Sequence, residues 1–283
     1  MLSEKVITVT RSPYTKRVTL ITDTNVRPKA AVVYFHGGGL LYGSRADLPK
    51  LHKETLTRAG YAIWACDYPL APACHLPEIM EAINESIAWY CEHGAEHLGH
   101  PLPYFLWGRS AGAYLALLAG AENDLPRFPA GIVSFYGYGF LCDNWFMMPS
   151  AHYKALPAVG EDCLENIPAE PHATGDLSTH YSVYVYARQQ GLWKDLIYEG
   201  RDKFFYLNYT LRLKDTLMAP LFAVHSMGDP DVPYEEFTEL CAKYNPTRFI
   251  VAGNEHDFDR NEGDPVTGTV LQKMTAFMDK CLA

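Results

Sequence analysis

The amino-acid sequence predicts an α/β fold with a mostly parallel central sheet flanked by helices. Short, continuous apolar runs recur along the chain, as expected for strands that are buried on both faces. Segments with apolar residues at helical spacing separate these runs. The alternation stops at about residue 140 and resumes at about residue 220. We therefore predict a single domain over residues 1–283, with an inserted lid or cap at about 140–215.

The strand candidates fall into two kinds. The first two alternate polar and apolar residues on either side of Ser12-Pro13-Tyr14, which indicates an antiparallel hairpin at the edge of the sheet. The others are mostly continuous apolar runs, which is typical of central parallel strands. In chain order, strands are expected at residues 6–9, 17–22, 30–35, 61–66, 104–107, 130–136, 221–226 and 248–252.

The helix candidates supply the right-handed crossovers that parallel strands require. They are expected at residues 50–59, 77–93, 111–119, 233–243 and 265–282. The second has one apolar stripe and should lie on the sheet as an amphipathic helix. The third is apolar on every face, which indicates a helix packed inside the domain.

Length and composition narrow the class of protein. The chain has 283 residues, of which 48% are hydrophobic and 20% charged, so it can form one large core. Its net charge of −9 and the lack of a basic cluster argue against nucleic acid or an anionic membrane as a partner. No segment resembles a secretion signal or a membrane span, so we expect a cytoplasmic protein without stable membrane insertion. The oligomeric state is left open.

Seven cysteines at irregular spacings indicate reduced thiols rather than a disulfide framework. No C-x-x-C pair is present, so we expect neither a metal site nor a redox site. No cofactor is predicted.

The predicted insertion is rich in aromatic residues. We expect most of them to pack the insertion's own core and a minority to face a ligand. They are Trp145, Phe146, Tyr153, Tyr181, Tyr184, Tyr186, Trp193, Tyr198, Phe204, Phe205, Tyr206 and Tyr209.

A serine flanked by glycines joins the strand at 104–107 to the helix at 111–119. The pentapeptide Gly108-Arg109-Ser110-Ala111-Gly112 has the G-x-S-x-G pattern of a strained turn, where glycines relieve crowding and the serine hydroxyl stands above the sheet. The helix N-terminus that follows favours developing negative charge. Ser110 is therefore the predicted nucleophile, and a satisfied serine in an ordinary turn is the alternative.

Three consecutive glycines follow the strand at residues 30–35. In His36-Gly37-Gly38-Gly39 they allow backbone N–H groups to approach a ligand closely, although a flexible loop would have the same composition. The tetrapeptide matches the oxyanion-loop pattern that accompanies a nucleophilic serine. We therefore expect an anion cradle here.

A serine hydroxyl attacks a carbonyl only when a base lies within hydrogen-bond reach and a carboxylate orients that base. His256 lies in the loop after the last predicted strand and is the predicted general base. The acid is Asp229 or Asp231, in the loop after residues 221–226. Asp229 is favoured because it directly follows the strand and a glycine, whereas Asp231 could merely cap the next helix. His225 is expected to be structural.

The chain order Ser110, Asp229, His256 is the one expected on the α/β-hydrolase fold. Over nearly its full length the chain resembles the α/β-hydrolase superfamily, and within it the hormone-sensitive-lipase-like carboxylesterases with an H-G-G-G loop. The resemblance implies the α/β-hydrolase fold, and it implies that the N–H groups of Gly38, Gly39 and Ala111 form an oxyanion hole. The motifs that carry it are HGGG at 36–39, DYPLAP at 67–72, GRSAG at 108–112, GDPDVP at 228–233 and EHDF at 255–258.

The chain departs from this family at two motifs. Arg109 and Ala113 stand where the family typically has aspartate and glycine, in G-D-S-A-G-G. Pro69 and Ala73 replace the arginine and glutamate of D-Y-R-L-A-P-E, so an ion pair typical of the family is expected to be missing. These differences leave open the similar formamidase branch, which uses the same triad on an N-formyl amide.

The residues and the resemblance together predict a serine carboxylesterase that hydrolyses small esters, with short acyl or aryl groups, through an acyl-enzyme intermediate. An amidase or formamidase acting on substrates like N-formylkynurenine is the alternative enzyme, because the insertion is aromatic-rich. A non-catalytic small-molecule binder on the same fold is a third possibility, but such a protein should have lost a triad residue. The expected partner in each case is a small molecule.

Overall fold

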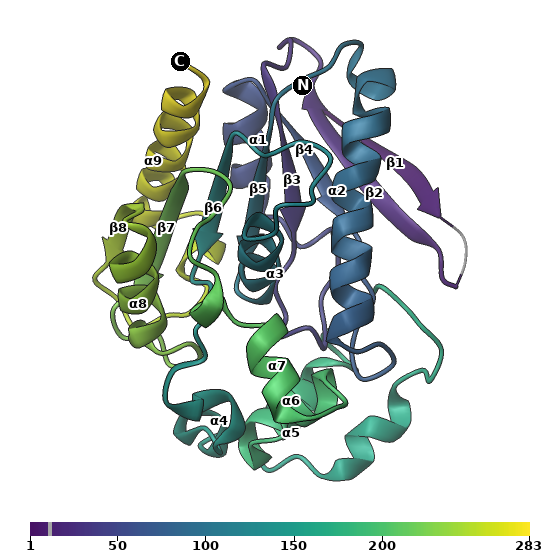
Figure 1. Ribbon diagram of the computed structural model, residues 1–283, viewed down its shortest axis with the longest axis vertical. Helices are drawn as coiled ribbons and strands as arrows, with labels where there is room; N and C mark the ends of the chain where they lie inside the picture. Colours follow the sequence, from purple (N-terminus) through teal and green to yellow (C-terminus); the bar gives the residue numbers. More distant parts are fainter. Residues whose placement is uncertain (11–12) are drawn as a thin grey trace.

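The computed structural model describes residues 1–10 and 13–283. These residues form an eight-stranded sheet with the order β1-β2-β4-β3-β5-β6-β7-β8 (Figure 1). The strands are β1 (Leu2–Thr10), β2 (Lys16–Asp23), β3 (Ala30–Phe35), β4 (Tyr61–Cys66), β5 (Tyr104–Arg109), β6 (Gly131–Phe135), β7 (Leu221–Ser226) and β8 (Thr247–Val251).

The pairing of these strands confirms a mostly parallel sheet. All pairs from β4 to β8 are parallel, while β1 pairs antiparallel with β2 and β2 antiparallel with β4. The predicted edge hairpin is therefore confirmed in its strands. Ser12, in its predicted turn, lies outside the described residues.

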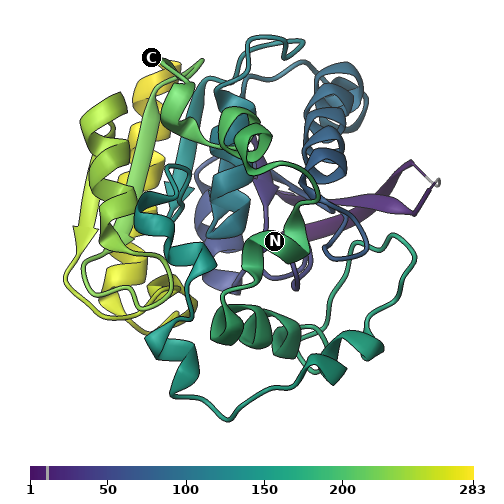
Figure 2. The same cartoon turned by 60° about the horizontal axis from the view of Figure 1, so that its bottom comes forward.

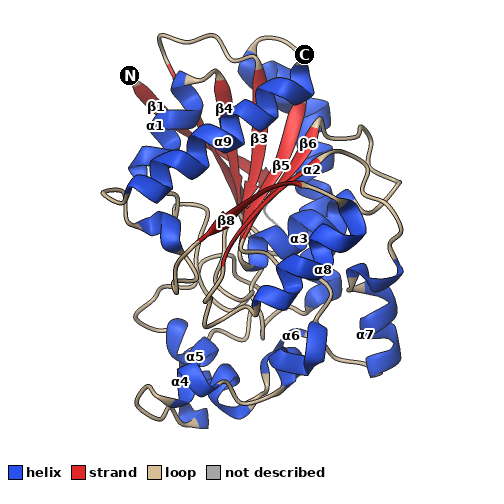
Figure 3. Ribbon diagram, turned by 90° about the vertical axis from the view of Figure 1, so that its left-hand side faces the viewer, coloured by secondary structure: helices blue, strands red, loops and turns tan. Residues whose placement is uncertain are grey.

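Helices cover both faces of the sheet, which explains why the central strands read as continuous apolar runs. Every residue of β3 to β7 is buried. Figure 3 shows α1 and α9 on one face and α2, α3 and α8 on the other. These helices are α1 (Lys50–Arg58), α2 (Leu76–Leu98), α3 (Ala111–Gly120), α8 (Tyr234–Tyr244) and α9 (Pro265–Leu282).

Helix α2 runs five residues further than the predicted end at residue 93. It continues through Gly94, where the Tyr90 ring lies in the space that a β carbon would take. The helix ends instead at Gly99, whose φ of 82° is the left-handed conformation that commonly closes a helix. A glycine inside the helical pattern is therefore a packing position here, and the stop signal lies five residues beyond it.

Residues 140–215, which we call the cap segment, connect β6 to β7 and gather at one end of the molecule (Figures 1 and 2). The segment folds into short helices separated by irregular chain. They are η1 (Cys142–Met147), α4 (Ala151–Lys154), η2 (Glu161–Asn166), α5 (Tyr181–Gln190), α6 (Trp193–Ile197), α7 (Asp202–Asn208) and η3 (Leu211–Leu213).

The aromatic residues of the cap segment pack largely on one another, as expected, but their cluster is not separate from the core of the sheet. Phe146, Trp193 and Phe205 are buried in the same hydrophobic cluster as Tyr114 of α3 and Leu40 of the glycine-rich loop. The cap segment packs directly on these elements, so its core continues the core of the sheet. In the described part of the chain, no helix is both long enough and apolar enough to cross a membrane.

Candidate active site

The turn between β5 and α3 holds Ser110 in a strained backbone conformation. Its φ is 52° and its ψ is −120°, a region that few residues other than glycine adopt. A β carbon at Gly112 would overlap the carbonyl oxygens of Phe35 and His36, and one at Gly108 would overlap the backbone of Gly112. The flanking glycines therefore let the helix start close against β3. Ser110 itself is 8% exposed.

The structure brings Ser110, His256 and Asp229 together from three separate loops. Ser110 Oγ lies 2.8 Å from His256 Nε2, and His256 Nδ1 lies 2.6 Å from Asp229 Oδ2. A carboxylate only accepts hydrogen bonds, so Nδ1 carries the proton and Nε2 of the neutral ring can accept the serine proton. This is the geometry that a serine nucleophile, its base and the base's orienting acid require.

The charges around His256 shift its protonation. Burial opposes a charged imidazole, but the Asp229 carboxylate and its hydrogen bond outweigh burial and raise the pKa of His256 to about 9. In the same way burial opposes a charged Asp229, but His256 and His225 hold the pKa of its carboxyl well below the usual range. The two groups thus form a buried ion pair when His256 is protonated.

Asp229 is fixed by its own loop. Its Oδ1 accepts hydrogen bonds from the backbone N–H groups of Asp231 and Val232, both at 2.9 Å. His225 Nε2 lies 3.3 Å from Asp229 Oδ2 and 3.1 Å from the Val232 carbonyl oxygen. His225 thus supports the acid from the end of β7, a contact that its position in the sequence did not reveal.

Three backbone N–H groups of the glycine loop and the serine turn have no partner in the described part of the chain. Those of Gly38, Gly39 and Ala111 make no hydrogen bond to any other described residue. Gly38 has a φ of 105°, and a β carbon there would overlap the Tyr42 carbonyl oxygen, so only glycine fits. Ala111 is the first residue of α3, where free N–H groups and the helix dipole favour an anion. Such donors suit a developing oxyanion.

The cap segment touches this cradle directly. Trp193, at the start of α6, donates from Nε1 to the Gly39 carbonyl oxygen at 2.8 Å. Tyr184 of α5 packs its ring where a β carbon of Gly39 would lie. The glycine loop is therefore held from the cap side as well as from the sheet.

Arg109, the residue before the serine, is fully buried in a polar network. Its Nε donates to the Tyr136 hydroxyl at 2.7 Å, and its Nη2 donates to Asp259 Oδ1 at 3.0 Å. Asp47 and His52 complete the network around Arg109 and Asp259. Burial disfavours a charged guanidinium, but Asp259 and its neighbours raise the pKa of Arg109 well above its usual value. These pairs compensate the buried charges.

This network links the serine turn to the histidine loop. Asp259 follows His256 by three residues, and the Tyr136 ring packs edge to face against the His256 ring at 4.7 Å. The departure from the family pattern at Arg109 thus has a structural consequence behind the serine. No sequence motif pointed to Tyr136 or Asp259.

Asp231, the alternative acid, does not orient His256 through Nδ1. It also does not cap α8: the N-cap position is occupied by Pro233 and no side-chain cap hydrogen bond is present, so the expectation of a cap is wrong. The Asp231 carboxylate instead accepts hydrogen bonds from the Tyr184 hydroxyl, at 2.8 Å to each oxygen. Its Oδ2 lies 3.9 Å from His256 Nε2.

The space over Ser110 is small. A cavity of about 20 Å³ is lined by Ser110, His256 and the glycine loop. It adjoins a recess of about 300 Å³, with which it shares Gly37, Tyr42, Asp47 and Arg260. Asp176 and Leu177 of the cap segment form the far side of this recess. A compact group bound at Ser110 could therefore extend in this direction.

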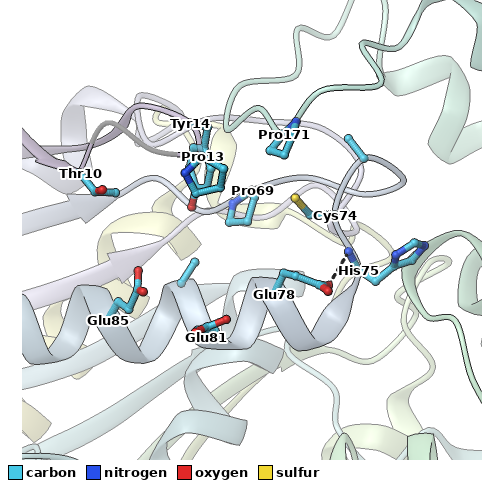
Figure 4. Close-up of a pocket in the computed structure, with 12 residues that line it drawn as sticks. Thr10, Pro13, Tyr14, Pro69, Cys74, His75, Glu78, Glu81, Glu85 and Pro171 are labelled. Carbon is cyan, nitrogen blue, oxygen red and sulfur yellow. Dashed lines mark hydrogen bonds between the residues drawn. The ribbon is translucent and has the colours of Figure 1, made fainter.

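The residues at the second motif that departs from the family pattern border a different cavity. Pro69 and Ala73 line a space of about 320 Å³ between the edge hairpin and α2, away from Ser110 (Figure 4). At its rim the backbone N–H of His75 donates to Glu78. Asp67, whose motif lacks the usual arginine, pairs with Arg45 at 2.9 Å. Arg45 thus supplies a charge partner for this turn from another loop.

Part of the chain is similar in sequence to a known protein family and to curated lipases and esterases. The BD-FAE family matches residues 20–140, which include the glycine loop and the serine turn. Lipase 2 of Moraxella sp. (strain TA144) is 30% identical over 98 residues, which is 35% of this chain and 23% of that protein. Acetyl esterase of Salmonella paratyphi B is 26% identical over 109 residues, 38% of this chain and 34% of the enzyme. The chain thus matches about a quarter to a third of the length of these curated relatives.

Solved structures cover the whole chain. A protein of unknown function from Staphylococcus aureus subsp. aureus Mu50 is 27% identical, with a TM-score of 0.84 and 100% of both chains covered. An α/β-hydrolase superfamily protein from Enterococcus faecalis is also 27% identical, with a TM-score of 0.83 over 98% of this chain and 99% of that one. The chain has the α/β-hydrolase fold. This confirms the fold class predicted from the motifs.

A more distant structural neighbour resembles the chain in fold only. The carboxylesterase EstE1, cloned from a metagenomic library, is 18% identical, with a TM-score of 0.71 over 100% of this chain and 90% of that one. At this level of identity the likeness shows a shared fold.

Proposed function

We propose that this α/β hydrolase is a serine carboxylesterase that cleaves small esters through an acyl-enzyme intermediate. The observation that carries the proposal is the pair of hydrogen-bond distances from Ser110 Oγ to His256 Nε2 and from His256 Nδ1 to Asp229, 2.8 and 2.6 Å. The names of the relatives, a lipase and an acetyl esterase, point to the same reaction class.

In the proposed reaction, Ser110 Oγ attacks the ester carbonyl carbon and passes its proton to His256 Nε2. The N–H groups of Gly38, Gly39 and Ala111 bind the resulting oxyanion. Collapse of the tetrahedral intermediate breaks the bond to the alcohol, which leaves with the proton from Nε2. Water then attacks the acyl-enzyme, again with His256 as base, and the acid product is released.

The size of the site supports small substrates. The cavity at Ser110 holds about 20 Å³ and the recess beside it about 300 Å³, the lower end of the range for small-molecule pockets. The cap residues Tyr184 and Trp193 are buried against the glycine loop. Short acyl or aryl esters therefore suit the site better than long acyl chains.

The proposal is tested with p-nitrophenyl esters of increasing chain length and the Ser110→Ala variant. We expect turnover to favour acetate and butyrate, and Ser110→Ala to lower kcat/KM by about 10⁴-fold or more. Ser86→Ala is a matched control, because Ser86 is equally buried but lies in α2 with its hydroxyl bonded to Ala82. Undiminished turnover by Ser110→Ala would refute the proposed nucleophile.

Aryl formamides test the alternative reaction, in which the same triad hydrolyses an N-formyl amide. They are compared with aryl esters that have the same leaving ring. A formamide specificity constant tenfold above that of the ester, about 1.4 kcal/mol in transition-state binding, would replace the ester assignment with a formamidase.

A further inference from the structure

Asp231 is a buried carboxylate beside the reacting edge of His256, and the proposed mechanism gives it no role. It is 6% exposed, and its Oδ2 lies 3.9 Å from His256 Nε2. Nε2 is the same atom that lies 2.8 Å from Ser110 Oγ. His256 therefore has one carboxylate bonded to Nδ1 and a second one near Nε2.

The cap segment holds Asp231 in this position. The Tyr184 hydroxyl donates to its carboxylate, and Arg188 Nε lies 3.4 Å from its Oδ1. Arg188 also donates from Nη2 to the Asp231 backbone carbonyl at 3.0 Å. Tyr184 and Arg188 are four residues apart in α5, so one face of this helix clamps the acid loop.

We propose that Asp231 is a positioning residue for His256: held by α5, it stabilises the protonated imidazole from the Nε2 side and so sets the pH at which His256 can act as base. The inference rests on the proposed function. It gives the cap segment a part in the chemistry, because α5 fixes the second carboxylate.

The surroundings of His256 make Asp231 the relevant second charge. Asp229 is bonded to Nδ1, and the uncharged Tyr136 ring covers one side of the imidazole. Asp257, next to His256 in the chain, is half-exposed and paired with Arg260, so solvent and this cation screen its charge. His225 contacts Asp229 rather than His256. Arg188 faces Asp231 and partly offsets it. Asp47, Arg109 and Arg260 line the same small cavity as His256, and these charges are the same in every variant compared below.

The sign of the effect follows from the charge. An anion near the imidazole favours its protonated form, so Asp231 raises the pKa of His256, as Asp229 does. Since the base must be neutral to accept the serine proton, a higher pKa moves activity to higher pH. Removing the Asp231 charge should therefore move the active range toward neutral pH.

The test is Asp231→Asn, which removes the charge and leaves an acceptor for Tyr184. We expect the ascending limb of kcat/KM against pH to move down by about one unit. The titration of the His256 ring, followed by NMR and assigned with His256→Gln, should move by the same amount. Asp231→Ser removes the same charge with a smaller side chain and should give the same direction if the Asn variant does not fold.

Asp257→Asn is the matched control, because it deletes an equal charge from a half-exposed neighbour of His256 that is paired with Arg260. Its shift should be clearly smaller. An unchanged or raised His256 titration in a folded Asp231 variant would overturn the inference, as would equal shifts in both variants. The NMR titration does not depend on ester turnover, so absence of esterase activity would count against the proposed function alone.

Discussion

At the scale of single residues, the backbone at Ser110 is held in a conformation that it would not adopt alone. The left-handed φ of 52° costs of the order of 1–3 kcal/mol, which the packing of β5 and α3 must offset. The close approach at Gly112 makes this packing possible, because its α carbon lies against the carbonyl oxygens of Phe35 and His36. The conformation of Ser110 thus depends on a neighbour that has no side chain.

Gly112→Ala should therefore destabilise the protein by about 3 kcal/mol or more, because the added methyl overlaps backbone atoms that cannot move aside. Urea unfolding measures this. Gly268→Ala is the control: Gly268 lies in α9 with open space around its α carbon, and the same change should stabilise by about 0.5–1 kcal/mol. Equal stability of Gly112→Ala and the native chain would contradict the geometry of the turn.

The pH dependence of the native enzyme follows from His256. Its pKa of about 9 leaves the imidazole largely protonated at neutral pH, so kcat/KM should rise as pH increases from 7 and level off only above about 9. Stopped-flow or initial-rate assays with an uncharged ester measure this limb. A plateau already reached at pH 7 would contradict the balance of charges around the imidazole.

At the scale of elements, the cap segment is tied to the site by individual side chains. Trp193 of α6 donates to the Gly39 carbonyl, and Trp145 of η1 donates to Glu236 of α8 at 3.0 Å. The two indoles stack on each other, yet only Trp193 holds the glycine loop. Substitutions of these two tryptophans can therefore distinguish support of the glycine loop from packing of the cap segment.

Trp193→Phe should lower kcat by about tenfold or more, because the peptide that presents the Gly39 N–H loses its restraint. Trp145→Phe, the matched change in the same cluster, should cost comparable stability but retain most of the activity. Thermal melts and kcat measured on both variants decide this. Equal losses of kcat in the two variants would show that the indoles act only through packing.

The sequence predicted the elements of the sheet better than those of the cap segment. β3, β4 and β7 were predicted to the residue, because strands covered on both faces are apolar without a break. The helices of the cap segment are short, between three and ten residues, so neither helical spacing nor a stop signal marked them. Tyr184 and Arg188 could not be told from other cap residues, since their partner, Asp231, is more than forty residues away.

Contacts between residues far apart in the sequence also limited the prediction of the site. Ser110, Asp229 and His256 follow from motifs at the ends of strands, and the parallel sheet gathers those ends at one edge. The network of Arg109, Tyr136 and Asp259 could not be predicted, because it depends on which buried groups meet across three loops.

At the scale of the whole molecule, buried ion pairs make stability depend on pH at both ends. Asp229 and Asp259 have carboxyl pKa values held well below the usual range, by His256 and by Arg109 respectively, against the effect of burial. Such groups stabilise the fold above about pH 4, and this contribution is lost as pH falls further. His256, with its pKa raised to about 9, stabilises the fold below about pH 6.5, and this contribution is lost as pH rises through 9.

The thermal midpoint should therefore be highest between about pH 5 and 7 and should fall on either side. In His256→Gln the fall on the alkaline side should shrink, because the group that loses its proton there is gone. Calorimetry from pH 3 to pH 10 on both proteins measures this. An alkaline fall of the same size in His256→Gln would contradict the assigned ion pair.

The central claim is that Ser110 is a nucleophile activated by His256 and Asp229, and covalent capture tests it most directly. An aryl phosphonate is incubated with the native chain, with Ser110→Ala and with His256→Gln, and the adducts are located by mass spectrometry of the peptides. We predict one adduct per native chain, on Ser110, no adduct on Ser110→Ala and much slower labelling of His256→Gln. A folded native chain that stays unlabelled, or that is labelled at another residue while Ser110 remains free, would contradict the account.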